Sequence, residues 1–316
     1  MAERPGLIRL LEEREALQAQ ALEDFERNLL ALSENIARRL GSVLGVDPDK
    51  IFPKQGDDGR DVGATDFEAR LDALDEAAQL RASVLLASLE EIEDFVEACG
   101  LDRTRADMRD TVGRLSALSE QSFQIQGVAG AVGALDTVSA EALLVGHYEM
   151  AIEDGLVGIY RTQAAQRIKE ALVANIGLVP ANRLAQDIAA REERSLGNSR
   201  TEARTRLAQA DRVAHEVVRQ TLDPEGDQFL IGYMGPRSGG NIRPFCSKLV
   251  GKAFKSEELE GLDNGQVGNV LTSAGGYNCR HYLIPIRADN IGDLGLVRGT
   301  EEDTAAAQGV NRRAKR

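Results

Sequence analysis

Tryptophan is absent from this chain of 316 residues, and aromatic residues make up only 4% of it. The hydrophobic content of 42% therefore comes mostly from Ala, Leu, Val and Ile. Together with 28% charged residues, this composition favours long amphipathic helices over β-sandwiches and barrels. The length allows one to three domains and a substantial core.

Cysteine is also scarce, with three residues, and an odd number this small excludes a disulfide scaffold. No segment approaches the roughly 20 apolar residues of a membrane-spanning helix. The first residues, Met1 to Arg14, are charged and lack the apolar core of a signal peptide. We therefore expect no membrane span and synthesis in a cytoplasm, where a spaced Cys/His set binds metal or is simply buried.

The chain also has no general excess of basic residues, since its formal net charge is −13. This charge argues against a protein that coats nucleic acid. Locally the balance differs: residues 236–287 contain seven Lys or Arg against four acids, and the chain ends in the basic run 312–316. A DNA-contacting role thus stays open as an alternative.

Long helices are the main feature of the first 130 residues. Leucines between 7 and 45 recur mostly at steps of three and four, which places them on one helical stripe. Further helices are predicted over 66–99, ending at Gly100, and over 103–126. We expect a helical arm, 1–130, whose stripe packs in an intramolecular bundle or, coiled-coil-like, against another subunit in self-association.

A helical connecting region is predicted over 131–200. It begins in the Gly/Ala-rich stretch 127–136, and Ser139 is the expected N-cap of a helix that continues to 176 with a break near Gly155 or Gly158. Two shorter helices are predicted over 180–195 and 201–221.

The composition of the sequence changes after Gly226. Eleven of the 31 glycines lie between Gly226 and Gly276, and short extended runs occupy 229–234, 270–272 and 282–286. The predicted fold is therefore mainly α: long N-terminal helices followed by a small glycine-rich α+β domain, 201–287. The polar remainder, 288–316, is expected to be a flexible tail.

Cysteine and histidine cluster in this domain. Cys279 and His281 are one residue apart, so on a strand both would face one centre, and Cys246 follows Pro244 at a turn or helix start. These three residues are candidate zinc ligands, and His215, Asp263 or a water would supply the fourth. A Cys246–Cys279 disulfide and plain buried thiols remain the alternatives.

A thiol hydrolase is the enzymatic alternative. Cys246 would be its nucleophile and His281 or His215 its base, with backbone N–H groups of 239–240 and 275–276 as the oxyanion pocket.

The linked motifs Tyr-Met-Gly-Pro (233–236), Arg-Pro-Phe-Cys (243–246), Leu-Val-Gly-Lys (249–252) and Gly-Gly-Tyr-Asn-Cys-Arg-His (275–281) resemble the C-terminal signature of phage Mu F-like minor head proteins, the head-morphogenesis family of tailed bacteriophages. The resemblance covers roughly 200–287. It marks the following residues as motif positions: Arg243, Cys246, Gly251, Asn278, Cys279, Arg280 and His281. Family members often carry an acid after the Gly-Pro pair, where this chain has Arg237-Ser-Gly-Gly.

The resemblance implies a structural protein, present in few copies inside the capsid near the portal, that acts in head assembly and in genome packaging or ejection. Its implied partners are portal or neck proteins and other virion proteins. The sequence thus offers three hypotheses: a structural virion protein, a thiol- or zinc-dependent hydrolase used during infection, and a DNA-contacting ejection protein.

Overall fold

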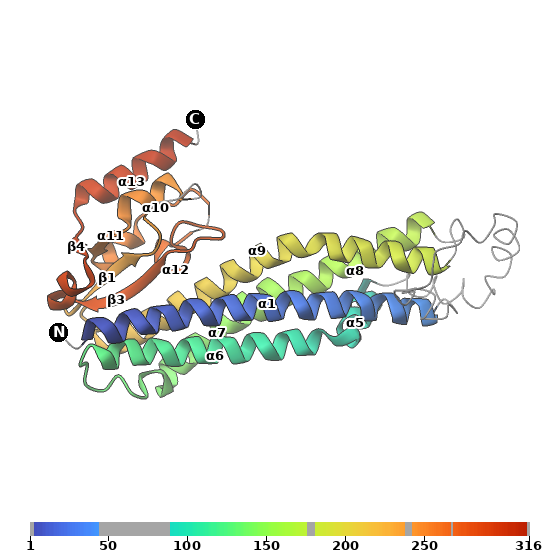
Figure 1. The fold of residues 1–316 in the computed structure, drawn as a ribbon, viewed down its shortest axis with the longest axis horizontal. Coiled ribbons are helices and arrows are strands. Elements are labelled where there is room, and N and C mark those ends of the chain that lie inside the picture. The colour runs from blue at the N-terminus through green and yellow to red at the C-terminus, as the bar shows by residue number, and fades with distance from the viewer. Residues whose placement is uncertain (1–2, 44–88, 176–180, 238–241, 267, 315–316) are drawn as a thin grey trace, which may run out of the picture. The chain divides into compact units, whose positions relative to one another are not determined.

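The computed structural model describes residues 3–43, 89–175, 181–237, 242–266 and 268–314. It is mostly helical, with long N-terminal helices and a small C-terminal domain that holds a four-stranded sheet and short helices, so the predicted fold class is confirmed (Figure 1). The chain divides into two compact units, 1–23 with 107–156 and 201–316, and 24–106 with 157–200. The predicted limit at 130 lies inside the first unit, whereas the limit at 200 coincides with the point where α9 (Ala181–Leu222) passes from one unit to the other; α1 (Glu3–Val43) also contributes to both units.

The second unit, 24–106 with 157–200, is a helical bundle. It contains parts of α1 and α9 together with α5 (Leu89–Val96), the π-helix η1 (Glu97–Leu101) and α8 (Ile159–Asn175). Its buried side chains are mostly aliphatic, among them Phe25, Leu29, Leu32, Ile36, Leu40, Ile92, Val96, Ile168 and Leu172. Gly100 has φ 121° and turns the chain into α6 (Asp102–Ile125), so the predicted helix end at Gly100 is confirmed. The start of that predicted helix, 66–88, lies outside the described residues.

The helices of the first unit that precede the small domain are the beginning of α1, most of α6, α7 (Val138–Tyr148), part of the π-helix η3 (Glu149–Gly158) and the end of α9. Apolar side chains of α1 and α6 form one buried cluster of Leu7, Leu10, Leu17, Leu115 and Leu118. Their spacing is the helical stripe expected from the sequence.

Two helix boundaries differ from the predictions. The helices predicted over 180–195 and 201–221 are one continuous helix, α9, because the apolar stripe on both sides of Gly197 outweighs a glycine that costs about 1 kcal/mol. The N-cap of α7 is Thr137 instead of Ser139: the Thr137 hydroxyl accepts a hydrogen bond of 3.3 Å from the Ala140 amide.

The small domain is built on a sheet in the order β3-β1-β2-β4. Strand β1 (Phe229–Met234) pairs antiparallel with β2 (Lys252–Phe254) and β3 (Tyr282–Arg287), and β2 pairs in parallel with β4 (Val297–Arg298). β1 and β3 lie where extended runs were expected. The run predicted at 270–272 instead belongs to the short helix α12 (Val270–Ser273), in which the Leu271 amide donates to the side chain of the N-cap residue Asn269.

Alternating residues of β1 separate two cores. Ile231 and Tyr233 face a cluster that includes residues of α10 (Pro244–Leu249), α11 (Ser256–Glu260) and α12. Leu230 faces the opposite cluster, with Ile284 and Ile286 of β3, and Leu11 of α1 packs against it. The period-two alternation of a strand therefore places the sheet between the helical part of this unit and the domain's own short helices.

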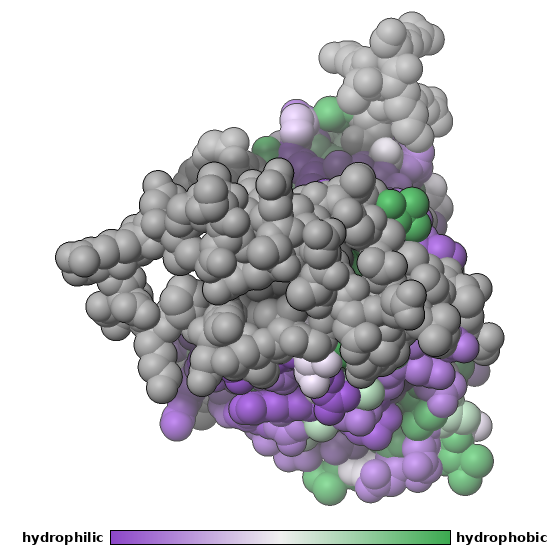
Figure 2. Space-filling view, turned by 90° about the vertical axis from the view of Figure 1, so that its right-hand side faces the viewer, coloured by the Kyte–Doolittle hydropathy of each residue, from purple (hydrophilic) through white to green (hydrophobic). Residues whose placement is uncertain are grey.

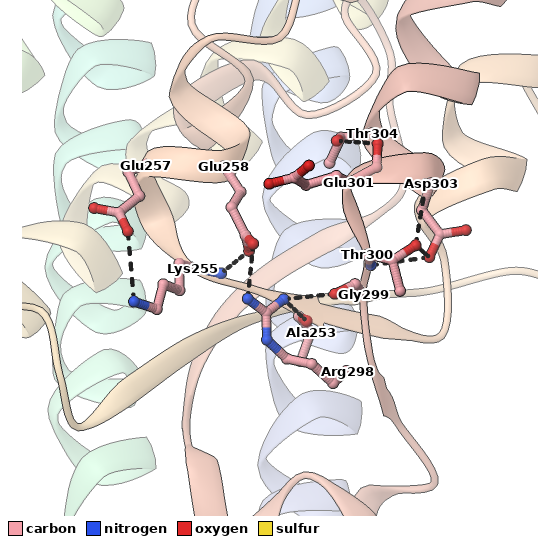
Figure 3. Close-up of polar contacts among 10 residues, drawn as sticks. All are labelled: Ala253, Lys255, Glu257, Glu258, Arg298, Gly299, Thr300, Glu301, Asp303 and Thr304. Carbon is pink, nitrogen blue, oxygen red and sulfur yellow. Dashed lines mark hydrogen bonds and ion pairs between the residues drawn. The ribbon is translucent and has the colours of Figure 1, made fainter.

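The interval 288–316 is ordered where the structure describes it, contrary to the expected flexible tail. Helix α13 (Glu301–Ala314) packs against α10, and Ala307 is fully buried in the domain core. Figure 3 shows the polar contacts at its start: Thr300 and Asp303 cap the helix reciprocally, and the Arg298 guanidinium binds Glu258 at 2.7 Å. The capping pattern Thr300-Glu-Glu-Asp303 is visible in the sequence and would have predicted this helix.

No described helix is long and apolar enough to cross a membrane. On the face drawn in Figure 2, the described residues are largely hydrophilic, and the hydrophobic ones form small separate groups.

Candidate metal centre

Helix α10 positions the first candidate ligand. Pro244 occupies the first turn, where its missing N–H costs nothing, and Arg243 precedes it in an extended conformation. Cys246 lies one turn into the helix and is 1% exposed. The Pro-Phe-Cys motif thus starts a helix, as expected, and turns the thiol into the domain core.

The other two ligands lie in the turns between α12 and β3. The prediction that Cys279 and His281 share one face of a strand is wrong, because β3 begins only at Tyr282. Their side chains converge because the chain turns tightly, with positive φ at Ala274, Gly276 and Asn278. Both side chains are buried.

Asn264 fixes these turns from the preceding loop. Its side-chain amide donates to the Ser273 hydroxyl and the Ala274 carbonyl, each at 2.9 Å. Its oxygen accepts from the Gln266 amide at 2.9 Å. The side chain is buried, so these bonds replace the water that would otherwise solvate it.

Two of the separations among the three donor atoms match those of a tetrahedral zinc site. Sγ of Cys246 and Sγ of Cys279 are 3.8 Å apart, and Sγ of Cys279 is 3.5 Å from Nδ1 of His281. Bonds of about 2.3 Å to sulfur and 2.0 Å to nitrogen in a tetrahedron give edges of about 3.8 Å and about 3.5 Å. All three atoms lie within 4.8 Å of one another. These separations are compatible with a bound zinc ion, which stays a prediction, and Cys246 and Cys279 are free thiols.

The second nitrogen of His281 is used in a way that suits a metal ligand. Nε2 lies 3.1 Å from the carbonyl oxygen of Pro236. Because a carbonyl can only accept, Nε2 donates to Pro236, and Nδ1 is the nitrogen that faces Sγ of Cys279.

The two thiols are not equivalent. The hydrogen bond from Cys246 lowers the pKa of Cys279, and His281 and the Arg212 guanidinium act in the same direction against the effect of burial. The same hydrogen bond, together with burial, raises the pKa of Cys246. The directions of the two pKa shifts favour Cys279 over Cys246 as the thiol that loses its proton first, and the thiolate is the form that binds metals.

Tyr233 and Gly275 complete the walls around the sulfurs. The Tyr233 hydroxyl lies 3.3 Å from Sγ of Cys246, and the Gly275 amide donates to Sγ of Cys279 at 3.3 Å. A β-carbon at Gly275 would overlap Sγ of Cys246. Glycine is required here for space rather than for a positive φ.

Arg212 of α9 holds the ligand loop, and sequence reasoning missed this residue. Its guanidinium donates to the carbonyls of Thr272 at 3.0 Å, Cys279 at 3.2 Å and His281 at 2.9 Å. The side chain is 4% exposed. A single arginine in a long polar helix has no sequence pattern that points to three distant carbonyls.

His215 is not brought to the centre. Its Nε2 lies 2.8 Å from one guanidinium nitrogen of Arg14. The other terminal guanidinium nitrogen of Arg14 binds Asp211 and, at 3.3 Å, the Ser119 hydroxyl. All four residues are buried and tie α1, α6 and α9 together. Among the described residues, neither His215 nor Asp263 joins the cluster of three donors.

The remaining motif residues lie around the cluster or support the sheet. Arg243 donates to the Tyr277 carbonyl, and Asn278 accepts from Arg204 at 3.1 Å. Gly251 has φ 83° and its amide bonds to the Tyr233 carbonyl at 2.8 Å. Arg280 is exposed beside the ligands.

Searches for related proteins found no match for this chain among protein families, curated proteins or solved structures.

Proposed function

We propose that this chain is a structural minor head protein of a tailed phage, located inside the virion near the portal, that acts in head assembly and in genome packaging or ejection. One observation carries the proposal. Motif pieces that resemble the Mu F-like signature, far apart in the sequence, supply the residues of one buried cluster: Tyr233, Cys246, Gly275, Cys279 and His281. The convergence of these motifs on one site supports the resemblance, because the matching residues form a connected set in space.

The long helices support the same proposal. Helices of 41 and 42 residues, α1 and α9, are each about 60 Å long at 1.5 Å per residue. Such helices suit a spacer or a docking arm along a portal or neck protein. The N-terminal helices would also provide the surface for self-association.

We further propose that Cys246, Cys279 and His281 bind zinc. The ion would join α10 to the loop before β3, and so fix a small domain with limited core of its own. It would supply folding stability, while Arg212 and Asn264 hold the ligand loop in place.

The hydrolase alternative with Cys246 as nucleophile has less support. The pKa of the Cys246 thiol is raised, and the imidazole nitrogen of His281 contacts the sulfur of Cys279. His215, the other proposed base, is engaged by Arg14. The DNA-contacting alternative rests on the basic residues of the domain and is an outcome of the experiment below.

Virion composition tests the proposal. Particles of the phage or prophage that encodes the chain would be purified and analysed by mass spectrometry, and a tagged copy would be used to recover bound virion proteins. We expect few copies per head and co-recovery of the portal protein. Absence from particles, together with normal heads after deletion of the gene, would refute the proposal. Recovery with DNA alone, lost at higher salt, would favour the ejection alternative.

Metal analysis tests the zinc site. We expect one zinc per purified chain, and almost none in Cys279→Ser. Cys99→Ser is the matched control, because Cys99 is a buried thiol of the other unit and should keep the full zinc content. Equal zinc in both variants would overturn the ligand assignment.

A further inference from the structure

The cluster offers three protein donors, and a zinc ion takes four ligands. Among the described residues no fourth His, Cys, Asp or Glu lies close enough to join Cys246, Cys279 and His281. Structural zinc sites are closed by four protein ligands, whereas a site with three keeps one position for water or an exogenous ligand. The donor count therefore points to an open position.

A small pocket meets all three donor residues. Its volume is about 20 Å³, and Cys246, Cys279 and His281 form part of its wall. A cavity of about 10–15 Å³ or more holds one water molecule. A larger cavity nearby, of about 130 Å³, touches Cys279 and His281 but not Cys246. Of these two cavities, the small pocket is the one that all three donor residues line, so it gives access to the proposed metal position.

The charge of this pocket favours an anion. A zinc ion with two thiolates and one neutral imidazole has no net charge, so the neighbouring side chains decide the local sign. Arg243 and Arg280 line the pocket with Asn278, and no acidic residue is among its described lining. No ion pair between described residues involves either arginine.

We propose that the metal centre has an exchangeable fourth position that binds an anionic oxygen, from a carboxylate or a phosphate, between Arg243 and Arg280. This inference rests on the proposed zinc binding, and it changes the role of the ion from a purely structural link to a ligand-binding site. Zinc would accept the oxygen directly, and the two guanidinium groups would balance its charge.

Cobalt substitution makes the fourth position visible. The full chain would be loaded with Co²⁺, whose visible absorption reports its coordination, and titrated with acetate and separately with inorganic phosphate at constant ionic strength. We expect a saturable spectral change with at least one of the two anions, and the tighter one identifies the source as carboxylate or phosphate.

The arginines provide the specific test. In the double variant Arg243→Ala with Arg280→Ala, cobalt should still bind, while the anion dissociation constant rises at least about tenfold because two charges are lost. Lys248→Ala is the matched control: it removes an exposed cation of the same helix, α10, that does not line the pocket, and should leave anion binding unchanged.

The outcomes separate this inference from the zinc site. A chain that binds no cobalt refutes the metal centre and this inference together. Cobalt binding with a spectrum that neither anion changes refutes the exchangeable position alone. Equal anion affinity in the double variant and the Lys248→Ala control refutes the role of the two arginines.

Discussion

Two parts of the same unit are stabilised in different ways. In the helices α1, α6 and α9, burial follows the helical period, and many leucines contribute to it. In the domain of β1–β4, single residues around the cluster each meet several groups: Asn264 and Gly275 do so within the glycine-rich turns, and Arg212 reaches these turns from α9. Stability in the helical part is therefore distributed, whereas in the domain it is concentrated at single positions and linked to the candidate metal centre.

Arg212→Ala should give the largest effect, because it removes a buried cation and leaves three carbonyls without their donor. We expect the free energy of unfolding to fall by about 3–5 kcal/mol. Zinc affinity should fall as well, by about tenfold or more, because the guanidinium positions the backbone of two ligands. Denaturant unfolding and competition with a zinc chelator measure the two effects.

Arg204→Ala is the control for this variant. It removes a neighbouring arginine of α9 that bonds to the exposed side of Asn278, so we expect less than about 1 kcal/mol and unchanged zinc affinity. Equal losses in both variants would show that the domain does not depend on single positions.

Gly275→Ala tests crowding at the cluster itself. Because the new β-carbon would overlap Sγ of Cys246, the two thiols must move apart. We expect a loss of about 1–3 kcal/mol and weaker zinc binding. Gly261→Ala is the matched control, since a β-carbon added there would meet no atom within 4 Å, and it should retain both properties. A Gly275→Ala protein that binds zinc normally would contradict the described geometry.

The pH dependence of stability tests the buried polar network of the helical part. Burial, and next the Arg14 charge, lower the pKa of His215 well below 6.5. The unfolded state therefore binds more protons below pH 6.5, and stability falls as the pH decreases through that range. We expect His215 to contribute a loss of about 1 kcal/mol per pH unit between roughly pH 6.5 and 5.5.

Unfolding at several pH values isolates this contribution. His215→Gln should flatten the acid side of the stability curve, whereas His147→Gln, at a less buried histidine whose pKa is also lowered by burial, should change it less. If the slope is the same in His215→Gln and the unsubstituted protein, the histidine is not held neutral.

How much of the structure could be predicted from the sequence depends on whether a feature leaves a local pattern or rests on distant contacts. The long helices, β1, β3 and the Cys/His cluster were predictable, because each leaves a local pattern: a stripe, an extended run or a spaced motif. The contacts of Arg212 and the convergence of Cys279 and His281 in a turn were not, because they depend on residues distant in the chain or on positive φ at Asn278. Helix α13 lies between these cases, since its capping pattern was present but its burial depends on packing against α10.

The smallest effect concerns a single cap in the helical part, where sequence and structure name different residues. Thr137→Ala removes the hydroxyl that accepts from the Ala140 amide, so the free energy of unfolding should fall by about 1 kcal/mol. Ser139→Ala, at the position that the sequence suggests, should change it by less than about 0.5 kcal/mol, because Ser139 lies inside α7 and is exposed. Denaturant unfolding of the two variants decides between the caps. A larger loss in Ser139→Ala would place the start of α7 two residues later. Neither substitution should alter the zinc content, because this cap belongs to the helical part of the unit, where stability is distributed over many residues.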